Sequence, residues 1–253
     1  MLSTRVIPCL LLRNQGLVKT VKFKDPKYVG DPINAVRIFN DKEVDELLFL
    51  DITATNERKR PPLKVIGEIA SECFMPLAYG GGIRTLDDIR EIFTVGVEKV
   101  CINSYAVEDP SFIAKAADIF GNQSIVVSID VKKGLFGKYE VFTHGGRSNT
   151  KLDPVEHAVR MEQMGAGELF INSIDRDGTQ QGFDIELVRK VASAVRIPVI
   201  ACGGAGTVAH FREAVKQGGA SAVSAGSMFV FHGKHRAVLI TYPGQEELER
   251  LFA

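Results

Sequence analysis

Pro76-Leu-Ala-Tyr-Gly-Gly-Gly82 and Pro198-Val-Ile-Ala-Cys-Gly-Gly204 are the two stretches that decide the fold of this chain of 253 residues. In each stretch a short apolar run ends in paired glycines, and the second pair follows the first by 203 − 81 = 122 residues. The same offset relates Glu46-Leu47 to Glu168-Leu169, Arg90-Glu91 to Arg212-Glu213, and Gly96 to Gly218. A period this long indicates a duplicated half-domain rather than a solenoid of short repeats.

Short apolar or β-branched runs alternate with amphipathic stretches along the chain. The expected strands are Arg5–Leu12, Glu46–Asp51, Pro76–Tyr79, Lys99–Asn103, Ile125–Asp130, Glu168–Asn172, Pro198–Cys202 and Ala222–Ala225. The expected helices include Asp31–Lys42, Pro62–Cys73, Leu86–Thr94, Pro110–Phe120, Asp153–Met164, Ile185–Val195, Val208–Gln217 and Gln245–Phe252. Strands that alternate with helices predict parallel βαβ units, and eight such units fit an α/β fold of the (β/α)₈ TIM-barrel type, built from two half-barrels. A doubly wound open sheet is the alternative, but it gives no reason for the repeat.

The composition limits the classes of function. Hydrophobic residues make up 45% of the chain, and 31 basic residues balance 31 acidic ones, which argues against a general nucleic-acid binder. The sequence shows neither a signal-peptide core nor an apolar run of membrane-spanning length. Its four cysteines (Cys9, Cys73, Cys101 and Cys202) lack the spacing of a metal site. We therefore expect a cytoplasmic protein with one domain over residues 1–253, no metal and no membrane contact.

Glycine and serine follow four of the expected strands. These positions are Gly80-Gly-Gly82 after the third strand, Asn103-Ser104 after the fourth, Gly203-Gly204 after the seventh and Gly226-Ser227 after the eighth. Glycines let backbone N–H groups approach an anion closely, and helix N-termini favour negative charge. The loops after strands seven and eight are the usual phosphate site of a barrel. Two such sites on opposite rims suit a ligand with a phosphate at each end; tight turns without a ligand are the alternative.

Asp130 ends the fifth expected strand, and its counterpart in the first half of the chain is Leu11, at an offset of 130 − 11 = 119 residues. In a doubled barrel the two positions should face each other across the mouth. A pair of carboxylates there could serve as general acid and general base. A carboxylate opposite a leucine cannot run that two-proton mechanism.

Four charged residues stand at the start of expected strands: Arg5, Glu46, Lys99 and Glu168. Side chains alternate along a strand, so each should point the same way as the apolar residue two positions later. The strand starts meet at the barrel floor, where charges near an apolar interior are costly unless they pair. Paired, they would form a neutral ring that could open for a small neutral molecule. The pattern alone favours the alternative of ordinary salt bridges at the rim.

Several motifs resemble the HisF family, the cyclase subunit of imidazole glycerol phosphate synthase, over nearly the whole chain. They include Ile7-Pro-Cys-Leu10, Gly30-Asp-Pro32, Phe49-Leu-Asp-Ile-Thr-Ala54, Gly80-Gly-Gly-Ile-Arg84, Lys99-Val-Cys-Ile-Asn-Ser104, Thr143-His-Gly-Gly-Arg147, Ser173-Ile-Asp-Arg-Asp-Gly-Thr179 and Gly203-Gly-Ala-Gly206. The resemblance implies a (β/α)₈ barrel with a HisH-like glutaminase docked on its floor, from which ammonia travels through the barrel to the mouth.

The resemblance also implies roles for individual residues and no cofactor. Arg5, Glu46, Lys99 and Glu168 would be the charged gate for ammonia, which reverses the preference for ordinary rim salt bridges. The expected catalytic positions are Asp130, Lys19, Asp51, Asn103 and Asp177, with Lys19 on a mobile first loop that folds over substrate. The expected phosphate contacts are Gly82, Ser104, Gly204, Gly226 and Ser227, for a phosphorylated small molecule.

The departures from the family lie near the chemistry. Leu11 replaces the family's other catalytic aspartate, Asn172 replaces a threonine, Cys202 a serine, and Tyr79 a small aliphatic residue. Loss of one general acid or base typically costs about 10²–10⁴ in rate. The run Cys9-Leu-Leu-Leu-Arg13 resembles a HisF-like subgroup that works with a HisH-like glutaminase and an ATP-dependent sugar amidotransferase. Those proteins build acetamidino groups on bacterial surface sugars such as lipopolysaccharide O-antigen.

Three hypotheses follow. In the first, the chain conducts ammonia for acetamidino-sugar synthesis, because the floor residues are kept while one catalytic aspartate is lost. In the second, it is a working cyclase of histidine biosynthesis that relies on Asp130. In the third, it is a phosphosugar isomerase of the related HisA type, which would also need an acid/base pair and would need no gate at the floor.

Overall fold

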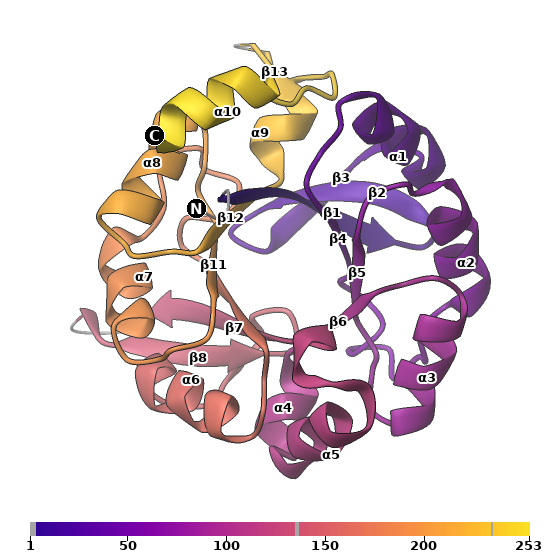
Figure 1. The fold of residues 1–253 in the computed structure, drawn as a ribbon, viewed down its shortest axis with the longest axis vertical. Helices are drawn as coiled ribbons and strands as arrows, with labels where there is room; N and C mark the ends of the chain where they lie inside the picture. Colours follow the sequence, from indigo (N-terminus) through magenta and orange to yellow (C-terminus); the bar gives the residue numbers. More distant parts are fainter. Residues whose placement is uncertain (1–3, 135–136, 234) are drawn as a thin grey trace.

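The computed structural model describes residues 4–134, 137–233 and 235–253. Eight parallel strands form a closed barrel, and helices surround it (Figure 1). The barrel strands are β1 (Arg5–Arg13), β4 (Leu47–Asp51), β5 (Leu77–Gly80), β6 (Lys99–Ile102), β7 (Ile125–Lys133), β10 (Glu168–Ser173), β11 (Val199–Cys202) and β12 (Ala222–Ala225). Pairing runs from β1 through β4, β5 and β6 to β7, and returns through β10, β11 and β12 to β1. The predicted (β/α)₈ barrel is confirmed.

The outer helices begin where the sequence supplies capping groups. They are α1 (Pro32–Asp41), α2 (Leu63–Glu72), α3 (Leu86–Thr94), α5 (Ser111–Phe120), α6 (Pro154–Gln163), α7 (Ile185–Ala192), α8 (Val208–Lys216) and α10 (Gln245–Phe252). The Asp31 side chain accepts a hydrogen bond from the Asn34 backbone N–H, and Thr85 and Asp88 form a reciprocal capping box. Figure 1 places α10 between α8 and α1, where it closes the ring of helices. Among the described residues, no helix has both the length and the apolar character that a membrane crossing requires.

The expected bounds differ from the structure chiefly in the long loops at the barrel mouth. The fifth strand continues three residues beyond Asp130 and pairs with β8 (Tyr139–Thr143), which pairs with β9 (Ser148–Asn149). The first loop forms an antiparallel hairpin of β2 (Gly16–Val21) and β3 (Lys24–Gly30). Two short helices, α4 (Ser104–Glu108) and α9 (Ser227–Val230), follow β6 and β12. The sequence analysis missed all of these elements, and β2–β3 lacks the Asn-Gly turn that signals a hairpin.

Alternation along the strands divides the interior into two cores. Outward residues such as Val6, Phe49 and Ile171 pack against the helices. Inward residues fill the lumen as a separate cluster: Ile7, Cys9, Leu48, Ala78, Cys101, Val126, Phe170, Ile200, Cys202 and Ala222. Leu11 and Leu50 pack against the top of this lumen cluster. The lumen is therefore apolar between its two polar ends, the floor and the mouth.

Candidate functional site at the two ends of the lumen

The four charged floor residues form a closed ring. Arg5 donates to Glu46 at 2.5 Å and to Glu168 at 3.0 Å, and Lys99 donates to the same two carboxylates at 3.0 Å and 3.2 Å. Cation and anion therefore alternate around the ring, so every charge has two neighbours of opposite sign. The side chain of Glu46 is 4% exposed and that of Arg5 is 28% exposed. The two carboxylates are buried and each bonds both cations, so the four residues form one connected network rather than separate pairs at the surface.

The ring lies directly below the lumen cluster. Arg5 is two residues before Ile7, Lys99 two before Cys101, and Glu168 two before Phe170, and all three apolar residues belong to that cluster. Glu46 immediately precedes β4 rather than beginning it, and it shares a face with Leu48. One oxygen of Glu168 is buried without a hydrogen-bond partner. These side chains therefore lie at the strand starts, at the end of the lumen opposite the mouth, and their role as a gate stays a prediction.

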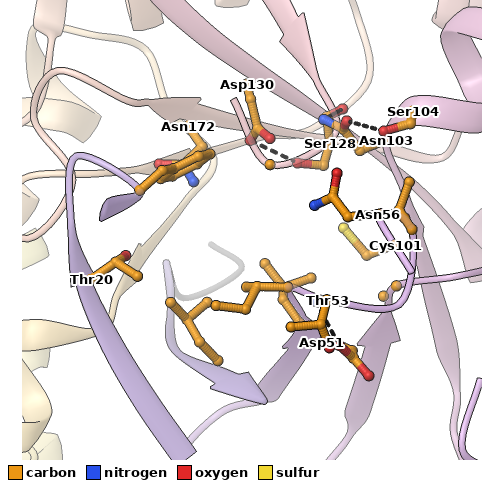
Figure 2. Close-up of a pocket in the computed structure, with 18 of the residues that line it drawn as sticks. Thr20, Asp51, Thr53, Asn56, Cys101, Asn103, Ser104, Ser128, Asp130 and Asn172 are labelled. Atoms are coloured by element: carbon orange, nitrogen blue, oxygen red, sulfur yellow. Dashed lines mark hydrogen bonds between the residues drawn. The ribbon is translucent and has the colours of Figure 1, made fainter. Parts of the chain in front are cut away.

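At the other end of the barrel, a cavity of about 470 Å³ opens at the mouth. Asp130 lines it from β7 and Leu11 lines it from β1, on opposite sides of the barrel. Asn172, Ser128 and Asn103 also line it, and Figure 2 shows Asn172 and Asp130 on the same side of the cavity. The cavity therefore has an acid and amides on one wall and leucine on the other, as the duplicated sequence predicts.

Asp130 can hold a proton near neutral pH. Its pKa is raised from 3.8 to about 7, chiefly by burial and in addition by the nearby charge of Asp177, against the lowering effect of a hydrogen bond from Ser128 at 3.5 Å. A carboxyl group with such a pKa can act as a general acid or a general base. The second carboxyl group in its neighbourhood, Asp177, is already engaged: it accepts hydrogen bonds from Thr20 at 2.9 Å and from the Phe23 N–H at 3.4 Å.

The β2–β3 hairpin lies over the mouth and brings Lys19 into the cavity. Lys19 and Thr20 are each only 5% exposed, and both line the cavity. The Lys19 ammonium donates to the Cys9 carbonyl. It also lies beside Gly226, because a Cβ added at Gly226 would come within 2.2 Å of the Lys19 Nζ. Burial lowers the pKa of Lys19.

Two of the expected catalytic residues are held by the backbone near them. Asp51 accepts hydrogen bonds from the N–H groups of Thr53 and Ala54 and from the Thr53 hydroxyl. Figure 2 shows Asp51 turned away from the middle of the cavity. Asn103 donates to the Ser128 carbonyl at 3.0 Å and accepts from Ser104. Both residues line the cavity, but these bonds are those of residues that shape the loops around it.

Most of the expected phosphate contacts meet at the mouth. Gly82 and Ser104 line the cavity on one side, and Gly226 and Ser227 line it on the other. Gly204 does not line it. The loop after β10 covers this residue, and a Cβ at Gly204 would come within 2.2 Å of the Gly182 carbonyl oxygen. Gly204 therefore permits the close approach of two loops, and its expected contact with a ligand has no support in the cavity.

Several residues of the cavity were missed by the sequence analysis. Thr20 comes from the unexpected hairpin, and Asn56 points into the cavity from the loop after β4 (Figure 2). Ser128 could have been identified, since it lies two residues before Asp130 on the same strand face. The buried Asn172 has an oxygen without a hydrogen-bond partner. Among the described residues, no group of three or more His, Cys, Asp or Glu side chains is placed to hold a metal ion.

Fold and site together define a class of protein: a duplicated (β/α)₈ barrel whose lumen joins a charged floor ring to an acidic cavity at the mouth. The sequence profile of the family described as histidine biosynthesis protein matches residues 5–236. A Pseudomonas aeruginosa protein, provisionally named imidazole glycerol phosphate synthase subunit hisF2, is 57% identical over 249 residues, which cover 98% of this chain and 99% of that protein.

Two further relatives carry similar names. A Leptospira interrogans protein, provisionally named imidazole glycerol phosphate synthase subunit HisF, is 48% identical over 253 residues and covers both chains completely. The imidazole glycerol phosphate synthase subunit HisF of Alkaliphilus metalliredigens is 47% identical over 232 residues, or 92% of each chain. The chain therefore belongs to the histidine biosynthesis protein family and is a HisF-like member of it.

Proposed function

We propose that this chain is the HisF-like synthase subunit of a glutamine amidotransferase complex and conducts ammonia from a HisH-like glutaminase to its mouth. The observation that carries the proposal is the closed ring of Arg5, Glu46, Lys99 and Glu168 beneath an apolar lumen. Neutral ammonia crosses an apolar passage more readily than an ion does, since a charge pays a large desolvation cost there. The glutaminase would dock on the floor, next to the ring.

The acceptor in this proposal is a bacterial surface sugar that receives an acetamidino group. The support is Leu11, which stands opposite Asp130. The resemblance to HisF implies a second catalytic carboxylate at this position. With Asp177 engaged by the hairpin, Asp130 lacks a free partner for a two-proton mechanism. An ATP-dependent sugar amidotransferase would take the ammonia. A phosphorylated ligand bound at Gly82, Ser104, Gly226 and Ser227 would not be converted. Its binding would signal to the glutaminase that the mouth is occupied.

A second candidate is the cyclase of histidine biosynthesis, and one observation favours it. Asp130 has a pKa of about 7 in a cavity that also holds Lys19 and Asn103. One acid with a pKa near neutrality could move both protons in turn, at a reduced rate. The relatives named for imidazole glycerol phosphate synthase are consistent with this alternative.

One assay separates the two functions. The purified chain is given the ribulosyl formimino-carboxamide nucleotide with ammonium salt, and formation of imidazole glycerol phosphate is followed. The conduction proposal predicts turnover about 10²–10⁴ below that of a HisF with both aspartates. Turnover equal to that enzyme would refute the conduction proposal and establish the cyclase. Binding of the glutaminase and stimulation of its activity are measured on the same preparation. They test whether the glutaminase docks next to the floor ring, whatever the outcome of the cyclase assay at the mouth.

A further inference from the structure

Asp130 on β7 and Asn172 on β10 are neighbours at the top of the lumen. The two strands are parallel, and Asn172 pairs in register with Asp130. Asp130 lies on the same strand face as Val126 of the lumen cluster. Asn172 likewise shares a face with Phe170 of that cluster, so both side chains point inward. Both line the cavity at the mouth, on the same wall (Figure 2). A molecule that leaves the apolar lumen toward the mouth therefore passes these two groups.

The side-chain oxygen of Asn172 has no hydrogen-bond partner among the described residues. Asn172 is 6% exposed, and this oxygen is fully buried. Gly203, in the loop after β11, leaves the space beside it free of a side chain, because a Cβ there would come within 2.8 Å of the oxygen. A buried polar group without a partner is costly, and such groups are rare in native proteins. The oxygen can therefore accept a hydrogen bond from a ligand.

The Asp130 carboxylate is also poorly satisfied. Its exposed fraction is 8%, and the side-chain bond that it accepts among the described residues comes from Ser128 at 3.5 Å, which is long for a hydrogen bond between oxygens. The Asn103 amide, which lines the same cavity, donates to the Ser128 carbonyl instead. The carboxylate and the Asn172 oxygen are therefore two acceptors on neighbouring strands that both have capacity for donors.

The titratable groups that face Asp130 add no positive charge. They are Asp177 in the loop after β10, Cys9 on β1 and Cys101 on β6. The Lys19 ammonium donates to the Cys9 carbonyl, and its charge acts on Asp177 rather than on Asp130. Buried carboxylates are usually paired with a cation, yet no described Lys, Arg or His forms an ion pair with Asp130. A small cation that carries N–H donors would satisfy both acceptors.

Ammonium has this chemistry, since it carries a single charge and four N–H donors on one atom. Neutral ammonia that arrives through the lumen is a stronger base than a carboxylate with a pKa of about 7, so it takes the proton of Asp130. One proton moves from oxygen to nitrogen, and a carboxylate–ammonium pair results. The ion does not return through the apolar lumen, because it would lose its partners there at a large desolvation cost.

We propose that Asp130 and Asn172 form an ammonium-binding site at the exit of the lumen, called the exit site below. Asp130 gives its proton to ammonia on arrival and takes it back when ammonia leaves for the acceptor. Asn172 determines specificity, because its oxygen accepts an N–H bond that an alkali cation does not offer. The use of the exit site rests on the proposed conduction of ammonia. Binding of ammonium to the isolated chain does not require the glutaminase.

Carbon-13 NMR of the full chain, labelled at the aspartate carboxyl carbons, tests the exit site. The signal that Asp130→Asn removes belongs to Asp130, and its titration midpoint is measured with different salts. We expect the midpoint to fall by about one pH unit in about 0.1 M ammonium chloride, as for a ligand at about ten times its dissociation constant that binds only the carboxylate form. Potassium chloride and tetramethylammonium chloride at equal concentration should leave it nearly unchanged. An equal fall in potassium chloride, or no fall in ammonium chloride, would overturn the exit site.

The role of Asn172 is tested with Asn172→Leu, which removes the amide at similar size. The ammonium-dependent shift should decrease to about half a pH unit or less, as for the loss of one hydrogen bond. Asn172→Val provides the same test if the leucine variant does not fold. Asn56→Leu is the matched control, because it removes a cavity amide from the loop after β4 and should keep the full shift (Figure 2). A full shift in the Asn172 variant would refute its part in the exit site.

A second titration separates the exit site from conduction. The chain is combined with its glutaminase, and an enzyme that consumes free ammonia is added to the solution. If ammonia travels through the lumen, glutamine should lower the Asp130 midpoint despite the scavenger. A midpoint that falls in ammonium chloride but not with glutamine would refute conduction and leave the exit site standing. A midpoint that ignores ammonium chloride while the glutaminase is still stimulated would refute the exit site alone.

Discussion

Leu11 and Asp130 face each other across the mouth of the barrel. Leu11 lies on β1 and Asp130 on β7, strands that are four positions apart in both directions around the closed sheet, and both side chains line the same cavity. Leu11 pairs in register with Leu50 on β4, which also lines the cavity, so that wall is apolar. The mouth therefore has an acid with a pKa near neutrality on one wall and two leucines on the opposite wall.

Leu11→Asp should create the missing carboxylate. Because a second general acid or base typically contributes about 10²–10⁴ in rate, cyclase turnover should rise by at least about hundredfold, while the unfolding midpoint falls because a charge replaces an apolar contact. Turnover is measured with the ribulosyl formimino-carboxamide nucleotide and ammonium. Leu11→Asn, which has the same size but cannot ionise, is the control. An equal rise in that variant would show that proton transfer was not the limitation.

The stability of the chain should depend on pH through Asp130. Its folded pKa is about 7 against 3.8 unfolded, so the folded state binds the extra proton between these values. Stability from this group is therefore lost as pH rises from about 4 to about 7, and the penalty is fully present above pH 7. Asp130→Asn removes this penalty, because the asparagine amide does not ionise. We expect this variant to be more stable than the wild type at pH 8, by about 1–3 kcal/mol, and to lose that advantage near pH 4.

The comparison requires denaturant titrations of both proteins at each pH, because other groups also titrate. Asp177 has a raised pKa from burial and acts in the same direction. Its charge is coupled to Asp130, so the difference between the two proteins reports Asp130 together with this coupling. A difference that does not change with pH would contradict the raised pKa of Asp130.

The floor ring should behave as one coupled unit. Lys99→Met leaves two buried carboxylates with one cation. We expect the free energy of unfolding to fall by about 2 kcal/mol. This loss is smaller than for a fully buried pair, because the Lys99 side chain is 17% exposed. In a double-mutant cycle with Glu168→Gln, the coupling energy should be about 1–2 kcal/mol. The exposed pair Arg250–Glu246 is the comparison and should show about 0.5 kcal/mol or less. Equal coupling in both pairs would mean that the ring is energetically an ordinary surface contact.

Gly226→Ala should displace Lys19 from the cavity and press on the backbone of β1. The added methyl group would meet the end of a flexible side chain, the Lys19 Nζ, at 2.2 Å and the Cys9 carbonyl at 2.9 Å. We expect the affinity for inorganic phosphate to fall by about tenfold, as for one lost charge-assisted hydrogen bond, and the unfolding midpoint to fall because the methyl group crowds the Cys9 carbonyl. Calorimetric titration measures the affinity. Gly244→Ala, which would meet nothing within 4 Å, is the control. Unchanged phosphate affinity would place the anion away from Gly226.

The sequence predicted the barrel and much of its site for identifiable reasons. The repeat of Gly81-Gly82 at Gly203-Gly204 indicated two halves, and strand periodicity placed Arg5 on the same face as Leu11 without knowledge of any contact. The missed elements lie in the loops at the mouth. Lys22 and Phe23 do not favour the turn they form, so no local signal predicts the hairpin, and Asp177, which holds it, is more than 150 residues away.

By itself, then, the sequence determined the eightfold alternation of strands and helices, the charged residues at the strand starts, and the leucine that stands where a second acid would be. Those features depend on periodicity and residue type, which are local. Only the tertiary structure decided that Arg5, Glu46, Lys99 and Glu168 close into one ring, that Gly204 is covered, and that Asp177 bonds the β2–β3 hairpin. The physical reason is that pairing, burial and pKa depend on the distances between segments, and those distances exist only after the barrel closes.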